Sequence, residues 1–440
     1  MRDGKRDIET DIESAKAAVD RGESTGLMEP MLIGESALHR TAVTDLVIEL
    51  ASRSAGFRRS LQDGVTSALA QLVRAMNCYY SNLIEGHDTH PVDIERALKN
   101  DYSADAKKRD LQLEAKAHIA VQQWIDRGGM DGRAVTTEGL REIHRRFCEL
   151  LPESLLWVES PDTGERRKVV PGALRDGDVK VGMHVAVSPG AVGRFLTRFE
   201  EAYGRFGKTD TILSAAAAHH RLLWIHPFLD GNGRVARLMS YSILRRALDT
   251  GGIWSIARGL ARNLDRYKAH LADCDQPRRN DLDGRGTLSE EALARFTQFF
   301  LETCIDQVKF MEGLVQPNRL RDRILIWAEE EIRADALPPK SGTVLEAVLF
   351  RGELPRGEVA ALLGTGERQA RRITSALVER EVLTSESSRA PLRLNFPAKL
   401  ASRWMPGLFP EPSGELGGKS GDRLVVRDLA RPREGSGELL

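Results

Sequence analysis

The 440-residue chain has little cysteine and no long apolar run. Its four cysteines are far apart and form no CxxC pair; they are Cys78, Cys148, Cys274 and Cys304. This spacing argues against a disulfide framework or a zinc site and favours reduced thiols. No window approaches the apolar length that spans a bilayer, and the charged start of the chain has no segment suited to a signal peptide. We therefore expect a cytoplasmic protein without a membrane partner.

The chain also lacks an excess of charge of either sign. Lys+Arg and Asp+Glu both total 64, so no overall field attracts nucleic acid or an anionic membrane, and any basic patch must be local. Hydrophobic residues make up 41% and charged residues 29%, which is ordinary for a globular protein. At this length two or three compact units are expected.

Apolar residues recur at helical spacing along most of the chain, starting near Ser36. The pattern changes between Glu159 and Pro189, where valines alternate on both sides of Gly182-Met183. This alternation predicts a β-hairpin over 178–187, packed on helices because an isolated hairpin is only marginally stable. The predicted fold class is mainly α with one hairpin.

Changes in composition divide the chain into six predicted segments. They are a polar N-terminal arm with little to bury (1–34), an N-terminal helical region (35–110), a catalytic core (111–317), a connecting helix and linker with a hinge at 337–342 (318–342), a small C-terminal unit (343–400) and a disordered tail (410–440).

Three helices followed by two short strands are predicted within 343–400, the order of a winged helix-turn-helix. Its third helix, 367–381, would enter the DNA major groove. The residues expected to reach bases or phosphates are Arg368, Gln369, Arg371 and Arg372 on this helix and Arg389 and Arg393 in the wing. Nearby glutamates offset this charge, and such units also serve as docking or dimer modules, so DNA contact is one of two options.

The segment 226–237 reads HPFLDGNGRVAR and follows a strongly helical stretch. Pro227 stops that helix, because the residue before a proline is pushed out of the α region. Gly231 and Gly233 then allow a tight loop before a second helix. A glycine loop at a helix N-terminus presents free N–H groups and binds phosphate.

Four side chains of this segment suit nucleotide chemistry. Arg234 and Arg237 share a helix face near the same anion, and arginine is well suited to phosphate. Asp230 would hold Mg²⁺ together with phosphate oxygens, and His226 would act as a base. The alternative is a helix-capping histidine with surface arginines, but the complete set favours attack of a hydroxyl on phosphorus.

The segment resembles the motif HPFx[DE]GNGRxxR of the Fic (filamentation-induced-by-cyclic-AMP) family at every position. The resemblance implies a protein adenylyltransferase, which transfers AMP from ATP to a Ser, Thr or Tyr hydroxyl of a protein and releases pyrophosphate. The implied roles are proton abstraction by His226, Mg²⁺ binding by Asp230, phosphate binding by Asn232 and the amides of Gly231 and Gly233, loop fixation by a buried Phe228, and binding of the β- and γ-phosphates by Arg234 and Arg237.

Two further features fit this resemblance. The hairpin at 178–187 lies where the family has its flap, which presents the target by strand pairing; a hairpin that only packs is the alternative. Asn263 and Tyr267 lie where the family often lines its adenine pocket, although core packing is a second role open to Tyr267.

The stretch Ser81-Asn-Leu-Ile-Glu85-Gly86 resembles the family's inhibitory motif [S/T]xxxE[G/N]. Ser81 and Glu85 share a helix face and Gly86 can end that helix. The resemblance implies that Glu85 pairs with Arg237 and repels the γ-phosphate. The simpler interpretation is a surface glutamate before a helix end.

The leading hypothesis is Mg²⁺- and ATP-dependent protein adenylylation, autoinhibited by Glu85. A rival of another class is a DNA-binding regulator whose Fic core senses nucleotide. A nearer rival is a Fic enzyme that transfers another nucleotide or phosphate, or that removes AMP. The expected partners are a protein target with a Ser, Thr or Tyr hydroxyl, with DNA and a second copy of the chain as further options.

Overall fold

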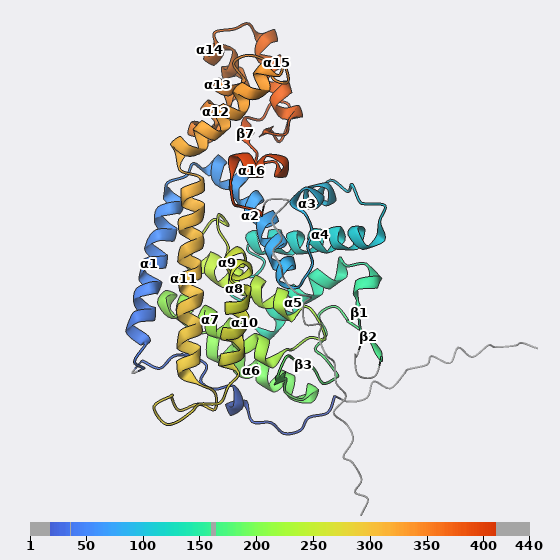
Figure 1. Cartoon of the computed structure of the whole chain (residues 1–440), viewed down its shortest axis with the longest axis vertical. Helices are drawn as coiled ribbons and strands as arrows, with labels where there is room; N and C mark the ends of the chain where they lie inside the picture. Colours follow the sequence, from blue (N-terminus) through green and yellow to red (C-terminus); the bar gives the residue numbers. More distant parts are fainter. Residues whose placement is uncertain (1–17, 36, 160–163, 411–440) are drawn as a thin grey trace, which may run out of the picture.

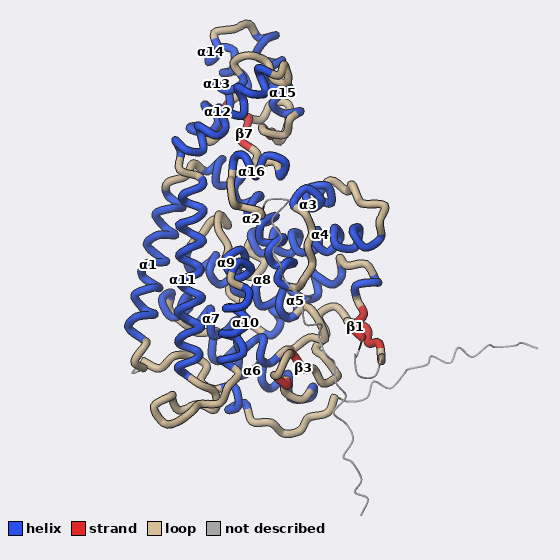
Figure 2. Tube along the Cα trace, viewed as in Figure 1, coloured by secondary structure: helices blue, strands red, loops and turns tan. Residues whose placement is uncertain are grey.

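The structure is a computed structural model and describes residues 18–35, 37–159 and 164–410. Helices dominate it, which confirms the predicted mainly α class (Figure 2). The helices before the motif are α1 (Arg40–Arg59), α2 (Asp63–Ile84), α3 (Pro91–Leu98), α4 (Ala106–Asp126), α5 (Thr137–Glu149), α6 (Val192–Tyr203) and α7 (Lys208–Ile225). Those after it are α8 (Asn232–Leu248), α9 (Ala257–Arg262), α10 (Leu264–Cys274), α11 (Glu290–Leu314), α12 (Pro317–Arg333), α13 (Ser341–Arg351), α14 (Val359–Leu363), α15 (Glu367–Glu379) and α16 (Ala401–Trp404).

Side-chain caps start several of these helices. The hydroxyl of Thr136 accepts a hydrogen bond from the N–H of Gly139 at 3.0 Å at the start of α5, and Ser289 does the same for Ala292 at 3.0 Å at the start of α11. Each cap satisfies one of the N–H groups that a helix leaves unpaired at its N-terminus. None of the helices in the described ranges combines the length and the apolar character needed to cross a bilayer.

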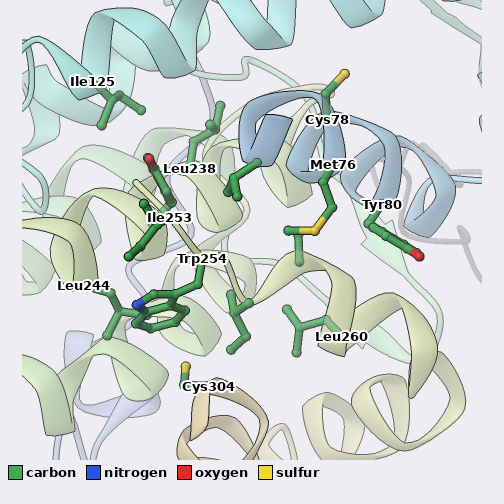
Figure 3. Packing of buried hydrophobic residues seen from close by; sticks show 14 of the residues in the cluster. Met76, Cys78, Tyr80, Ile125, Leu238, Leu244, Ile253, Trp254, Leu260 and Cys304 are labelled. Atoms are coloured by element: carbon green, nitrogen blue, oxygen red, sulfur yellow. The ribbon is translucent and has the colours of Figure 1, made fainter. Parts of the chain in front are cut away.

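The core lies where α7 and α8 pack together and α2, α9 and α11 close around them. The long helices α1 and α11 run side by side along one flank of the molecule (Figure 1). Figure 3 shows part of this packing, with Met76 of α2, Leu238 of α8 and Cys304 of α11 around the fully buried Trp254. All four cysteines are buried and free, as expected for reduced thiols.

The predicted hairpin over 178–187 is confirmed by strands β3 (Lys180–Val181) and β4 (His184–Val185), which pair antiparallel around Gly182-Met183. A second hairpin, which the sequence analysis missed, pairs β1 (Trp157–Glu159) with β2 (Arg166–Lys168). The Trp157 ring lies 5.2 Å from the guanidinium carbon of Arg166, so a cation–π contact supports this exposed pair of strands.

The segment 18–34 packs on the core, contrary to the expectation that the N-terminal arm has little to bury. Met28, Met31 and Ile33 are buried. Arg221 of α7 donates two hydrogen bonds to the carbonyl of Pro30, at 2.8 and 3.2 Å. Three apolar side chains spread over six positions have no helical or strand period, which is why the sequence analysis overlooked them.

The C-terminal unit contains α13, α14 and α15 and a three-stranded sheet of order β5 (Glu353–Leu354), β7 (Leu392–Leu394), β6 (Leu383–Thr384). It lies at one end of the molecule, above the helices of the core (Figure 1). The predicted hinge at 337–342 is wrong, because Leu337 and Ser341 are buried and α12 packs on α13.

The stretch 401–409, which the sequence analysis left unassigned, fastens the C-terminal unit to α2. The hydroxyl of Tyr80 in α2 donates to the carbonyl of Leu408 at 2.9 Å. Just before this stretch, the carboxylate of Glu95 in α3 accepts the N–H of Ala398 at 2.9 Å. Trp404 is buried against Trp327, with ring centroids 5.2 Å apart. The predicted disordered tail, from residue 411 on, lies outside the described residues.

Candidate active site

The motif lies between the end of α7 and the start of α8. His226 takes a left-handed conformation (φ 51°), and its N–H still donates to the carbonyl of Leu222 at 3.0 Å. Gly231 takes φ 80° immediately before α8 begins at Asn232. The loop is therefore six residues long, 226–231, and leads directly into a helix N-terminus, which is the arrangement that binds anions.

Asn232 fixes the shape of this loop. Its side-chain oxygen accepts the N–H of Phe228 at 3.0 Å, and its amide donates to the carbonyl of Phe228 at 2.8 Å. Phe228 is buried as the resemblance implied, with its ring stacked on His144 at a centroid distance of 4.0 Å. Because both ends of the Asn232 amide bond to the loop, this side chain holds the loop's shape and has one N–H left for a ligand.

His226 is buried and has one ring nitrogen free. Its Nδ1 lies 3.3 Å from the carbonyl of Leu223, which accepts a proton carried on that nitrogen. Within the described residues Nε2 has no hydrogen-bond partner. Burial, aided by the charge of Arg175, lowers the pKa of His226 to about 3. The imidazole is therefore neutral at physiological pH, with Nε2 able to accept a proton.

Arg175 is a buried residue of this site that the sequence analysis missed. It donates to four main-chain carbonyls: those of His226 at 2.6 Å, Gly177 at 2.9 Å, Ile225 at 3.4 Å and Val187. These contacts fasten the hairpin segment to the turn that carries His226. Arg175 lies in no motif or periodic pattern that would separate it from the exposed arginines of the chain, so no sequence signal could have identified it.

Asp230 is partly exposed at the loop, and its carboxylate accepts the N–H of Gly231 at 2.6 Å. Nowhere in the described ranges do three His, Cys, Asp or Glu residues form a group that could hold a metal. A single carboxylate beside a phosphate site suits Mg²⁺, which usually takes one or two carboxylates together with phosphate oxygens and waters.

Arg234 and Arg237, the two arginines of α8, are both buried and both paired with carboxylates from other helices. Arg237 donates to Glu85 at 2.5 Å, to the hydroxyl of Ser81 at 2.9 Å and to the Ser81 carbonyl at 3.1 Å. Arg234 donates to Glu114 of α4, a residue that the sequence analysis did not single out. Each guanidinium therefore has an anionic partner in the absence of a nucleotide.

Glu85 caps the C-terminal end of α2 and lies over the first turn of α8. A Cβ at Gly233 would lie only 2.4 Å from its Oε1, so a larger residue there would require the Glu85 side chain to move. Burial raises the pKa of Glu85, but the charges of Arg237 and Arg234 outweigh it and hold the pKa at about 2. An ionised carboxylate thus lies at the helix N-terminus expected to bind phosphate.

The hairpin presents three exposed apolar side chains, Val181, Met183 and Val185. His184 anchors it, with Nε2 2.7 Å from the carbonyl of Trp224 in α7. The N-terminal segment runs beside it, where the carboxylate of Glu23 accepts the N–H of Ser188 at 2.8 Å. The hairpin is therefore held at its base, with its tip in solvent.

Asn263 and Tyr267 differ in their surroundings. Asn263 is partly exposed between α9 and α10, and its amide donates to the carbonyl of Gly259 at 2.9 Å. Tyr267 is buried, with its hydroxyl 2.6 Å from Nε2 of His219. This placement favours the packing role that the sequence left open for Tyr267, whereas Asn263 has a surface that a ligand can reach.

Residues 134–244, from the turn before α5 to most of α8, match the Fic/DOC family. Two curated relatives are the protein adenylyltransferase Fic of Drosophila willistoni, 27% identical over 224 residues, and that of Drosophila grimshawi, 28% identical over 198 residues. The matches cover 48% and 43% of this chain but only 42% and 38% of the relatives, so the chain spans less than half of their length.

Two solved structures that this chain resembles are described as Fic proteins. A Fic family protein from Desulfovibrio desulfuricans is 16% identical, with a TM-score of 0.48, over 83% of this chain and 98% of that one. Fic-1 from C. elegans is 18% identical, with a TM-score of 0.44, over 63% of this chain and 74% of that one.

Proposed function

We propose that this chain, which carries a Fic/DOC domain at residues 134–244, transfers AMP from ATP to a Ser, Thr or Tyr hydroxyl of a protein target. The observation that carries the proposal is the unpartnered Nε2 of a neutral His226 beside a helix N-terminus with two arginines. A base next to an anion site is the arrangement required for attack of a hydroxyl on phosphorus.

In the proposed reaction the target hydroxyl gives its proton to Nε2 of His226, and its oxygen forms a bond to the α-phosphorus. The bond from that phosphorus to the oxygen bridging to the β-phosphate breaks, and pyrophosphate leaves with the electron pair. Arg234 and Arg237 would hold the β- and γ-phosphates as this charge develops. Asp230 would hold Mg²⁺, which offsets phosphate charge when it is bound.

Glu85 is proposed to keep this reaction slow by binding Arg237. The carboxylate occupies Nη2 of Arg237 and repels a second negative charge beside it, so the γ-phosphate would compete with Glu85 for this guanidinium. The hairpin of β3 and β4 is proposed to act as the flap, with its exposed apolar side chains against a target segment that pairs with a strand edge.

The position of the transferred label tests the proposal. ATP labelled at the α-phosphate is expected to leave its label on protein, whereas ATP labelled at the γ-phosphate leaves none, with both reactions run in Mg²⁺ and resolved by gel electrophoresis. Transfer of the γ-label would instead indicate a phosphotransferase. Release of AMP from a modified target, without any labelling, would indicate the reverse reaction.

DNA binding by the C-terminal unit is a second proposed function. Arg368, Arg371 and Arg372 of α15 are exposed and, in the described part of the chain, belong to no ion pair. Arg393, which was expected to reach phosphate, instead pairs with Glu353 at 3.0 Å and Glu386 at 2.9 Å. The candidate basic surface therefore consists of the start of α15 and Arg389, which is also exposed.

Binding of the whole chain to mixed-sequence duplex DNA, followed by fluorescence anisotropy, tests this second function. Three phosphate contacts predict a roughly fortyfold loss of affinity between 50 and 200 mM salt. The double variant Arg371→Ala, Arg372→Ala should lower both the affinity and the salt dependence. Binding that is equally strong in that variant would place the contact elsewhere.

A further inference from the structure

Glu114 is the buried partner of Arg234. It lies in the middle of α4, and its side chain is only 2% exposed. One carboxylate oxygen accepts from Arg234, and the other lies 2.7 Å from Nδ1 of His87. Burial raises the pKa of Glu114, but the charge of Arg234 and the hydrogen bond to His87 more than offset it, so the pKa lies below its usual range. The carboxylate is therefore ionised and bonded through both oxygens.

Glu85 and Glu114 hold their arginines in different ways. Glu85 ends α2 and its side chain is 32% exposed, and Gly86 follows it with φ 83°. Because Glu85 lies at the end of a helix, next to a glycine, its carboxylate can turn toward solvent without disrupting α2. The Glu114 side chain cannot turn toward solvent in this way, because α4 continues for three turns beyond it. If the carboxylate did move away, Arg234 would remain buried without a counter-charge.

Arg234 keeps donors for a ligand while Glu114 holds it. The bond to Glu114 uses one terminal nitrogen, Nη2, which also lies 3.3 Å from Nδ1 of His87. Its Nε is buried and has no hydrogen-bond partner within the described residues. The guanidinium also lies over the ring of Phe147, 5.3 Å from the ring centroid, which restricts its rotation. Its remaining N–H groups are thus held in a fixed direction.

We propose that Glu114 is a positioning residue that stays bonded to Arg234 during the reaction and aims its free donors at the β-phosphate. This inference rests on the proposed adenylyl transfer. The two carboxylates then have different roles. Glu85 releases Arg237 when ATP binds productively, whereas Glu114 keeps its bond to Arg234. With Glu85 displaced, the pair of arginines keeps one net positive charge for the nucleotide, and Arg234 stays fixed by its buried partner.

The effect of a Glu→Gln substitution at each glutamate on the rate of AMP transfer distinguishes a positioning role of Glu114 from an inhibitory one. Glu85→Gln is expected to raise AMP transfer. Glu114→Gln, placed in a Glu85→Gly chain, is expected to lower transfer at least tenfold relative to Glu85→Gly alone. An increase in transfer in the Glu114→Gln chain would overturn the proposal, because it would make Glu114 a second inhibitor.

Nucleotide binding supplies a readout that general loss of structure would not reproduce. Isothermal titration calorimetry in the Glu85→Gly chain should show that Glu114→Gln lowers the affinity for ADP about tenfold. The affinity for AMP should fall less than twofold. Equal weakening of both nucleotides in a folded variant would contradict the positioning role, and so would no weakening of either.

Glu114→Asp provides the second variant in case Glu114→Gln fails to fold. It keeps the negative charge next to the buried Arg234 but shortens the side chain by one methylene. The affinity for ADP should therefore fall two- to fivefold, and the affinity for AMP should not change. Unchanged ADP binding would overturn the proposal. Because the binding assay requires no transfer, a chain that binds both nucleotides yet labels no protein would contradict adenylyl transfer without affecting this test.

Discussion

Replacing Glu85 with glycine is expected to raise AMP transfer roughly ten- to hundredfold. The variant removes the ion pair with Arg237 and the negative charge that lies over the first turn of α8. A hydrogen bond between charged groups contributes about 1.5–3 kcal/mol, and each 1.4 kcal/mol corresponds to about a tenfold change. The measurement is the initial rate of protein labelling from ATP carrying an α-phosphate label.

Ser81→Ala is the matched control for this prediction. It removes the hydroxyl that accepts from Arg237 at 2.9 Å but leaves the Glu85 carboxylate in place. Labelling should rise much less than in Glu85→Gly, because no charge leaves the anion site. Equal labelling of Glu85→Gly and the unmodified chain, with both folded by circular dichroism, would show that Glu85 is not an inhibitor.

Replacing His226 with alanine is expected to lower AMP transfer by about 10²–10⁴-fold, the usual contribution of a positioned base. The loss follows from the geometry, because Nε2 is the free proton acceptor of the loop. The comparison is best made in the Glu85→Gly chain, where the starting rate is highest. ADP affinity should change little, because the proposed phosphate contacts are those of the loop amides and the arginines.

His39→Ala serves as the matched histidine control, since His39 lies before α1, outside the motif loop. Its rate of transfer should equal that of Glu85→Gly alone. Transfer that persists at full rate in the His226→Ala chain would show that another group accepts the proton, and the proposed mechanism would then be wrong.

The rate of transfer in the Glu85→Gly chain should be nearly independent of pH between about 5 and 8. A base is inactive when protonated. The pKa of His226 lies at about 3, well below the usual histidine pKa of about 6.5, so its proton-accepting form persists in mild acid. The pKa of Glu85, held at about 2, predicts likewise that mild acid does not release Arg237 in the unmodified chain. A rate that halves near pH 6.5 would contradict the buried, neutral His226.

The loop of the motif could be predicted because its conformation depends on neighbours in the sequence. Pro227 ends α7, Gly231 takes a positive φ, and Asn232 bonds to Phe228 four residues before it. The hairpin around Gly182 was predictable for the same reason, since a period of two and a turn residue are local signals. Local signals failed at Met28 and at the supposed hinge, where burial is set by distant helices.

The sequence by itself determined the helical class, the candidate phosphate-binding loop and the identity of the candidate base, because each depends on residues within a few positions of one another. Only the tertiary structure decided which charges meet. Glu114 and Arg234 are 120 positions apart, and Arg175 reaches the carbonyl of His226 over 51 positions. Spacing in the chain carries no information about such contacts, because they exist only once α4, α8 and the hairpin segment have packed. The pairing of Glu85 with Arg237, expected from resemblance alone, likewise joins residues 152 positions apart.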